Sequence, residues 1–200
     1  IYTLVYTLSL HDALPISLAD FLAPKSSGKP DFIGAFAVTA GLGLQAVVRE
    51  HEANHDDYQA ILAKVLADRL AEAFAEYLHE RVRRELWGYA PDENLSLEDL
   101  LRERYAGIRP APGYPPCPDH RDKQVIWDLL QAEVHTGASL TESCMMIPPA
   151  SVSGFYFAHP ESFYFSVGKV TAEQVHDYAR RKGENGKTTE TWLRTVLAAD

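Results

Sequence analysis

The segment that most constrains the fold is Arg109–Pro118, in which five of ten residues are proline. Each proline fixes φ and removes a backbone donor, so this proline loop cannot form a helix or a central strand. The N–H groups of Ala111, Gly113 and Tyr114 remain as polar contacts for a ligand, and Gly113 would let a ligand approach the backbone closely. The guanidinium of Arg109 suits a carboxylate or a phosphate. We therefore expect a stiff, extended loop that is able to bind an anionic group.

Composition and charge exclude several classes of protein. The chain has 200 residues, of which 46% are hydrophobic and 24% charged, as expected for one soluble domain or a large part of one. A net charge of −9 without a basic patch argues against nucleic-acid and anionic-membrane partners. Two cysteines are too few for a disulfide framework and indicate a reducing compartment. No apolar run reaches the ~20 residues of a membrane span. With the compartment that the cysteines indicate, we expect a cytoplasmic chain.

Hydrophobic periodicity predicts one buried strand and one long helix in the first half of the chain. Residues 31–40 are apolar and β-branched, which is typical of a buried strand, and a helical segment follows over residues 44–54. From Tyr58 to Leu86, large apolar residues recur every three or four positions, which predicts a helix of about thirty residues. A second face of this helix carries alanines, against which another backbone could pack closely.

The patterns in the second half of the chain predict shorter helices and strands. Several strands with interspersed helices indicate an α+β fold. The predicted helices are 94–105, with Ser96 and Asp99 as a cap pair, 120–133, capped by Asp119, 171–183, opened by Thr171–Gln174 and ended by Gly183, and 189–198. The predicted strands are 139–147, 151–158 and 162–170, with the last two as a hairpin.

One family shares the proline loop and its surroundings. Gly107–Pro118 resembles the S-adenosylmethionine-binding loop of the activation domain of cobalamin-dependent methionine synthase. The resemblance continues through Ala67–Glu80, Trp87–Pro91 and Ala150–Gly154, and it covers roughly residues 18–200. A likeness of this length is far more specific than a single short motif. It implies an antiparallel twisted sheet with helices packed around it.

The resemblance also implies a function. The domain would bring S-adenosylmethionine over the corrin when the cobalamin of the parent enzyme has been oxidised, while a flavodoxin-type protein supplies one electron. The partner would be the cobalamin-binding domain of the parent chain, because cobalamin is held there. The parent enzyme transfers a methyl group to homocysteine, and we expect the isolated fragment not to make methionine.

The same resemblance assigns binding roles and no catalytic or metal-binding ones. The implied roles are Arg109, Ala111, Gly113 and Tyr164 in contact with the methyl donor, Phe165 beside its nucleoside, Glu72 and Glu103 as acidic positions near it, and Tyr114 facing the cobalamin. From the residues alone, Glu72 is either a solvated carboxylate or one that faces a ligand. Two departures bear on the site: Phe165 stands where the family has a second tyrosine, and a donor-binding aspartate would lie upstream of Leu18.

Two other functions compete with this interpretation. The proline loop could be a connector, or part of a non-catalytic module that docks on a protein partner. His51-Glu-Ala-Asn-His55 matches the H-E-x-x-H pattern of zinc hydrolases, with Glu52 as the general base. A catalytic zinc needs a third protein ligand, and no acidic residue nearby stands at a recognised spacing.

The first seventeen residues differ from the rest of the chain. Residues 1–17 repeat Tyr-Thr-Leu, lack the basic start of a signal peptide, and resemble a translated sequencing adapter. The alternative interpretation is a genuine short strand. The family resemblance begins abruptly at Leu18, as expected for a gene truncated at its 5′ end. We therefore expect residues 1–17 not to be part of the fold, and residues 18–200 to be the C-terminal part of the activation domain with an incomplete site.

Overall fold

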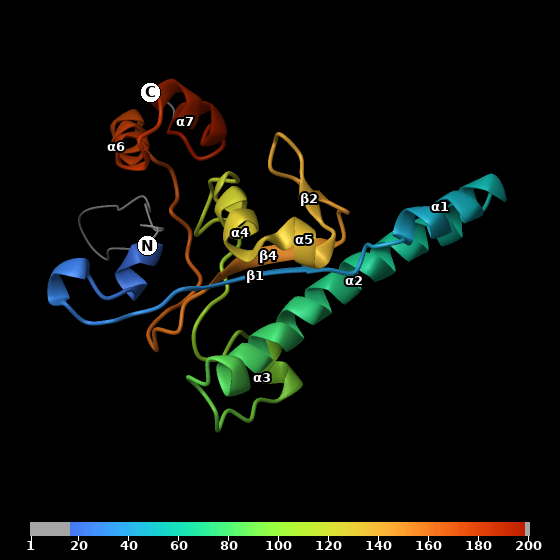
Figure 1. Cartoon of the computed structure of the whole chain (residues 1–200), viewed down its shortest axis with the longest axis horizontal. Helices are drawn as coiled ribbons and strands as arrows, with labels where there is room; N and C mark the ends of the chain where they lie inside the picture. The colour runs from blue at the N-terminus through green and yellow to red at the C-terminus, as the bar shows by residue number, and fades with distance from the viewer. Residues whose placement is uncertain (1–16, 199–200) are drawn as a thin grey trace. The chain divides into compact units, whose positions relative to one another are not determined.

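The computed structural model of the chain describes residues 17–198 (Figure 1). The segment predicted to be foreign, residues 1–17, lies outside this range except for Ser17, so that interpretation stays a prediction. The described residues form two compact units: the first contains residues 17–34, 106–120 and 156–198, and the second contains residues 35–105 and 121–155.

Along the described chain, runs of helices are separated by a single strand and by a run of three strands. In order they are η1 (Leu18–Phe21), η2 (Lys25–Ser27), β1 (Gly34–Thr39), α1 (Leu44–Ala53), α2 (Asp57–Arg81), η3 (Val82–Leu86), α3 (Leu97–Leu101), α4 (Asp122–Leu130), α5 (Ala132–Thr136), β2 (Ser139–Leu140), β3 (Met146–Ile147), β4 (Ser151–Tyr156), α6 (Ala172–Lys182) and α7 (Gly186–Trp192). The predicted α+β class is confirmed by this mixture of helices and small sheets and by the structural comparison reported below.

The sheets are small and lie in the part of the chain where strands were expected. β1 pairs with β4, and its inward residues Phe36 and Val38 are buried, which confirms the buried strand predicted over residues 31–40. β2 and β3 pair antiparallel, with Ser139 opposite Ile147. The predicted strand 139–147 is therefore two short strands joined by a turn.

The predicted strand over residues 162–170, and its hairpin with the preceding strand, are wrong. The structure forms no strand there. The backbone N–H of Val167 donates to the carbonyl of Pro115 at 3.2 Å, and the N–H of Val170 donates to Val196 at 2.9 Å. The backbone donors of residues 162–170 thus bond to separate parts of the first unit, so this segment cannot form a continuous ladder with a neighbouring strand.

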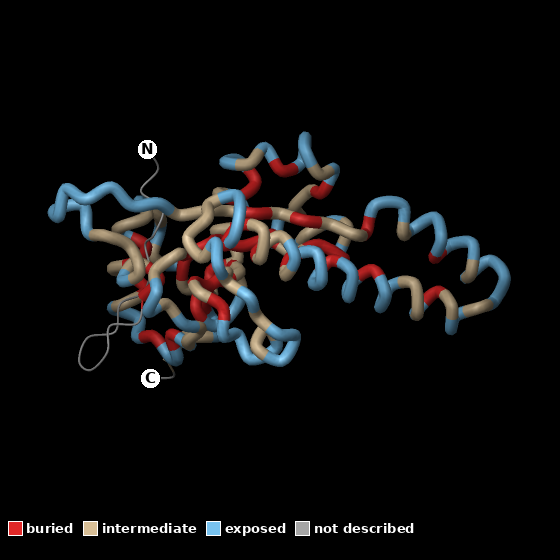
Figure 2. The backbone as a smooth tube through the Cα atoms, turned by 90° about the horizontal axis from the view of Figure 1, so that it is seen from below, coloured by how far each residue is buried: buried red, intermediate tan, exposed pale blue. Residues whose placement is uncertain are grey.

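The long helix α2 buries its alanine face and exposes its large apolar residues. Ala60, Ala67, Ala71 and Ala75 are buried, and α1 packs against α2. Buried positions recur along this helical hairpin at helical intervals (Figure 2). These findings confirm the prediction that another backbone can pack closely against the alanine face, where small side chains allow a close approach. The exposed apolar residues on the helix are Tyr58, Ile61, Val65, Leu66, Leu70, Phe74 and Tyr77.

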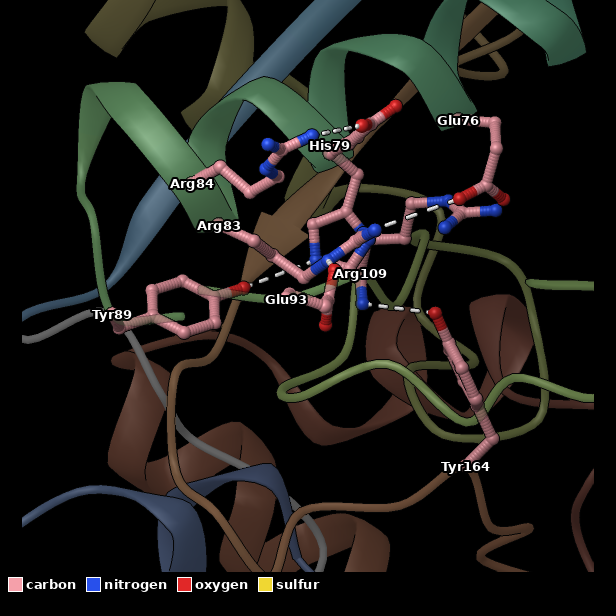
Figure 3. Close-up of polar contacts among 9 residues, drawn as sticks. Glu76, His79, Arg83, Arg84, Tyr89, Glu93, Arg109 and Tyr164 are labelled. Atoms are coloured by element: carbon pink, nitrogen blue, oxygen red, sulfur yellow. Dashed lines mark hydrogen bonds and ion pairs between the residues drawn. The ribbon is translucent and has the colours of Figure 1, made fainter. Parts of the chain in front are cut away.

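A buried arginine lies where α2 continues into the π-helical turn η3. Arg83 is 0% exposed, and its Nε donates to Oε2 of Glu93 at 2.6 Å. Its guanidinium carbon lies 4.7 Å from the centre of the Tyr105 ring, and that ring also contacts His79. His79 is fully buried, and its Nε2 lies 3.1 Å from the hydroxyl of Tyr89 (Figure 3). Buried polar and aromatic side chains therefore hold the end of α2 in place.

Three helix boundaries test the predicted caps. Ser96 and Asp99 form a capping box at α3, as predicted, and the hydrogen bond from the Ser96 hydroxyl lowers the pKa of Asp99. The predicted cap at Asp119 is wrong: α4 begins at residue 122, after Arg121, and Asp119 is buried. The last helix, α7, begins after Asn185 and ends at residue 192, earlier than the predicted range 189–198.

Helix α6 has both of the predicted end signals. Thr171 and Gln174 form a capping box, and Gly183 ends the helix in the left-handed conformation. Replacing Thr171 with alanine removes the side-chain acceptor, and we expect a loss of about 1 kcal/mol in the free energy of unfolding. Urea denaturation measures this loss. Thr188→Ala, at an exposed position within α7, is the matched control, and equal losses in both variants would contradict a capping role.

Candidate functional site

The proline loop is anchored by backbone contacts along its length, all within the first unit. Prolines leave the loop few donors of its own, so neighbouring segments supply much of the bonding. The anchoring contacts are the antiparallel bridge of Ile108 with Phe157, the N–H of Arg109 donating to the Tyr164 hydroxyl at 3.0 Å, and the N–H of Val167 donating to the Pro115 carbonyl at 3.2 Å. The contact of Arg109 with Tyr164 is drawn in Figure 3.

The loop also closes on itself, and this changes which N–H groups can meet a ligand. Gly113 donates to the carbonyl of Cys117 at 2.7 Å, and Tyr114 donates to the carbonyl of Ala111 at 3.2 Å. Both N–H groups are therefore already bonded within the loop, and the contacts of Gly113 and Tyr114 with a ligand remain predictions. The N–H of Ala111 has no acceptor among residues 17–198. Of the three predicted backbone donors, Ala111 is the one that the structure leaves available.

Gly113 is required by a neighbouring side chain. The residue has a φ of +96°, and a Cβ placed on it would lie 2.2 Å from Cε1 of His120. The imidazole therefore occupies the space that a side chain at position 113 would need. Sequence reasoning explained this glycine by the approach of a ligand, whereas the structure gives a packing reason within the chain itself.

The side chains around the loop differ in exposure. Arg109, Tyr164 and Phe165 are partly buried, and Tyr114 is 62% exposed. The ring of Phe165 packs against Phe21, with ring centres 6.1 Å apart. The loop thus carries an exposed aromatic side chain, Tyr114, and a partly buried guanidinium, Arg109, which is suited to binding an anion. The predicted contacts of these residues with a donor or with cobalamin remain predictions.

The eight predicted site residues fall into two groups. Six of them, Arg109, Ala111, Gly113, Tyr114, Tyr164 and Phe165, lie in the first unit. Glu72, on α2, and Glu103, after α3, lie in the second unit, and both are exposed. The structure thus brings together the loop and Tyr164, and it leaves both carboxylates open to solvent.

The H-E-x-x-H pattern does not form a helical zinc site. Helix α1 ends at Ala53, and His55 has a φ of +58°, outside the helix. His51 and His55 therefore do not share a helical face, as the zinc hydrolase pattern requires. No cluster of three or more His, Cys, Asp or Glu that could hold a metal ion occurs within residues 17–198.

Sequence reasoning missed three residues that support the end of the loop. Asp119 directly follows the loop, is 2% exposed, and accepts a hydrogen bond from the hydroxyl of Tyr178 at 3.0 Å. Nζ of Lys182 lies 3.3 Å from the same carboxylate oxygen. Both partners lie on α6. The hydrophilic character of Asp119 and Lys182 gives no signal for burial, so the pairing emerges only from the fold.

Comparison with known proteins agrees with this arrangement. Residues 9–183 match the family described as vitamin B12 dependent methionine synthase, activation domain, and the chain belongs to this family. A crystal structure of the MetH reactivation domain bound to AdoHcy is similar to this chain, with a TM-score of 0.89 and 62% sequence identity. The match covers 92% of this chain and 56% of that chain, so the chain spans little more than half the length of that relative.

No helix in the described part of the chain is long and apolar enough to cross a membrane.

Proposed function

We propose that this chain binds S-adenosylmethionine through the proline loop, for the reductive methylation of cobalamin in a cobalamin-dependent methionine synthase. The observation that supports the proposal most is the 62% identical reactivation domain, which holds AdoHcy. AdoHcy is what remains when S-adenosylmethionine gives up its methyl group. A domain that binds the product of this transfer is suited to binding the donor.

The residues present fit such a ligand. The guanidinium of Arg109 offers two parallel N–H donors to the carboxylate of the amino acid end. The open N–H of Ala111 offers a further donor two residues along the chain. Glu72 and Glu103 belong to the other unit, and their role as acidic positions near the donor is what the resemblance to the family implies. Because contacts with Phe157, Tyr164 and Val167 already anchor the loop, little of its conformational entropy is lost on binding.

The role of the chain is positioning rather than covalent chemistry. When bound, S-adenosylmethionine supplies the methyl group, which with one electron converts cob(II)alamin to methylcobalamin and leaves AdoHcy. Tyr114, with 62% of its surface exposed, would lie against the cobalamin face. Arg109 and Ala111 would hold the donor at the required distance and orientation, which is where such a site gains rate. No side chain of this chain needs to act as an acid, a base or a nucleophile.

The partners and the location belong to the same proposal. The cobalamin would be held by another domain of the parent methyltransferase, and a flavodoxin-type protein would deliver the electron. The two cysteines, Cys117 and Cys144, are buried thiols that form no disulfide with each other, in keeping with a cytoplasmic protein. The isolated chain would therefore bind the donor without making methionine.

A calorimetric titration of S-adenosylmethionine into the full chain tests the proposal. Arg109→Ala removes charge-assisted hydrogen bonds, and we expect binding to weaken about 10- to 100-fold. Arg102→Ala is the matched control, because Arg102 is exposed and pairs with Glu98 on α3. A wild-type chain that shows no binding, or an Arg109→Ala variant that binds as well as the control, would reject the assignment of the donor site.

A further inference from the structure

A buried charged cluster lies at the C-terminal end of the proline loop. The carboxylate of Asp119 is 3% exposed, and the ammonium-bearing side chain of Lys182 is 14% exposed. Oδ2 of Asp119 accepts from the Tyr178 hydroxyl at 3.0 Å and lies 3.3 Å from Nζ of Lys182. The same Nζ lies 3.3 Å from the Tyr178 hydroxyl and 5.1 Å from the centre of its ring. The three groups therefore contact one another in pairs.

The sequence places these groups so that the contact fixes the loop. Asp119 follows Pro118, the last residue of the loop, without an intervening residue. Tyr178 and Lys182 are four residues apart on α6 and so share one face of that helix. α6 is itself held by the apolar cluster of Val170, Val175, Tyr178 and Leu193. The end of the loop is thus tied to a packed helix.

Burial of this cluster is not explained by stability alone. Removing a carboxylate and an ammonium from water carries a desolvation cost that apolar residues of similar size would avoid. Charge-assisted hydrogen bonds, however, have narrow requirements for distance and direction, so they fix the groups that make them. A buried ionic contact is therefore suited to setting one position of the loop end against α6.

A short chain of contacts carries that position into the loop. His120 follows Asp119 directly, and its imidazole occupies the space beside the backbone of Gly113. Gly113 donates to the carbonyl of Cys117 at 2.7 Å, which closes the turn of the loop. A displacement of Asp119 would move His120 and remove the support of this turn. Tyr114, within this turn, donates to the carbonyl of Ala111, whose N–H is the open donor.

We propose that Asp119, Tyr178 and Lys182, here termed the loop latch, are positioning residues that hold the proline loop in its ligand-binding conformation. The latch contacts no ligand itself and acts through His120 and the turn at Gly113. This inference rests on the proposed function for the identity of the ligand. It adds that affinity for the donor depends on α6, an element that carries none of the predicted binding residues.

The experiment measures loop order and ligand binding separately, in the full chain. Tyr178→Phe and Lys182→Met remove one latch group each, and Lys182→Arg keeps the positive charge. Asp177→Asn is the matched control, because Asp177 makes exposed ion pairs with Arg180 and Arg181 on the same helix. Hydrogen exchange is followed at the loop amides of Gly113, Tyr114 and Cys117, with the amide of Leu193 as the reference for the stability of the unit. Titration with S-adenosylmethionine gives the affinity.

The latch predicts a specific pattern. In Tyr178→Phe and Lys182→Met, the loop amides should exchange about tenfold faster relative to Leu193, and the dissociation constant should rise about tenfold. Lys182→Arg should keep the loop exchange rate and the dissociation constant close to the wild-type values. Asp177→Asn should change neither quantity. Equal acceleration at the loop and at Leu193 would show a purely structural role and overturn the proposal. Unchanged loop exchange, or faster exchange with unchanged affinity, would also overturn it.

The design also separates the two proposals. If the wild-type chain does not bind S-adenosylmethionine, the proposed function fails, and hydrogen exchange still decides whether the latch orders the loop. If the wild-type chain binds and the latch variants bind equally well, the latch fails and the proposed function stands.

Discussion

Replacing Gly113 with alanine is expected to destabilise the chain by about 3 kcal/mol or more and to abolish binding of S-adenosylmethionine. The new Cβ would lie 2.2 Å from Cε1 and 2.5 Å from Nδ1 of His120, closer than such atoms can approach. The φ of +96° adds strain of about 1–2 kcal/mol for a residue with a Cβ. Overpacking adds about 1–3 kcal/mol. Urea denaturation and titration with the ligand measure the two effects.

Two further variants separate the clash from the backbone strain. Gly168→Ala is the control, because Gly168 also has a positive φ, +65°, and no atom lies within 4 Å of a Cβ built there. We expect this control to lose only about 1 kcal/mol. Adding His120→Ala to Gly113→Ala should recover part of the loss. If Gly113→Ala costs no more than Gly168→Ala, the imidazole does not constrain the loop.

Replacing Glu93 with leucine is expected to lower the free energy of unfolding by about 3 kcal/mol. Arg83 is 0% exposed, and Glu93 is its nearest carboxylate, at 2.6 Å. Removing one partner leaves a buried charge without its main compensation, which costs about 3–5 kcal/mol. Glu76 lies 4.0 Å from the guanidinium and compensates part of that charge, so we expect the lower end of the range.

Two further variants serve as controls for the Glu93→Leu prediction. Arg83→Met combined with Glu93→Leu removes both charges and should recover much of the lost stability, since the desolvation cost disappears with them. Glu85→Gln breaks the exposed pair of Arg81 with Glu85, and we expect no measurable change. A Glu93→Leu variant as stable as Glu85→Gln would show that the buried charge is compensated by other groups.

Local signals predicted the elements whose causes are local. The capping boxes at Ser96 and Thr171 and the strand around Phe36 depend on residues near one another in sequence, and all three are confirmed. The segment over residues 162–170 alternates like a strand, and Phe163 and Phe165 do contact one another on one side. Its backbone nevertheless bonds to the proline loop and to the C-terminal segment, which no periodicity can predict.

The long helix shows a second limit of pattern reasoning. Periodicity identifies which residues of α2 share a face, but it does not decide which face enters the core. The alanine face is buried, and larger apolar residues such as Leu70 and Tyr58 are 62% and 72% exposed. Close packing between helices favours small side chains, and that preference determined the buried face here.

Part of the candidate site could likewise be predicted from the sequence, and part could not. The family resemblance assigned Arg109 and Tyr164 to the same ligand, and the structure joins the two residues by a hydrogen bond, while their contacts with that ligand remain predictions. Asp119 was read as a helix cap, because an aspartate between a proline and a helical segment usually is one. Its partners lie on α6, and Tyr178 is 59 residues further along the chain. Such distant pairs follow from tertiary structure alone.

The separation between Asp119 and Tyr178 has a consequence for synthesis of the chain. A ribosome adds about 5–20 residues per second, so the 59 residues between the two take roughly 3–12 s to appear. During that interval the proline loop has left the peptidyl-transferase centre without the helix that later holds it. The part of the second unit that follows the loop, residues 121–155, is made in the same interval. The five prolines limit the conformations of the loop until α6 emerges, so the newly made segment waits in a nearly extended form.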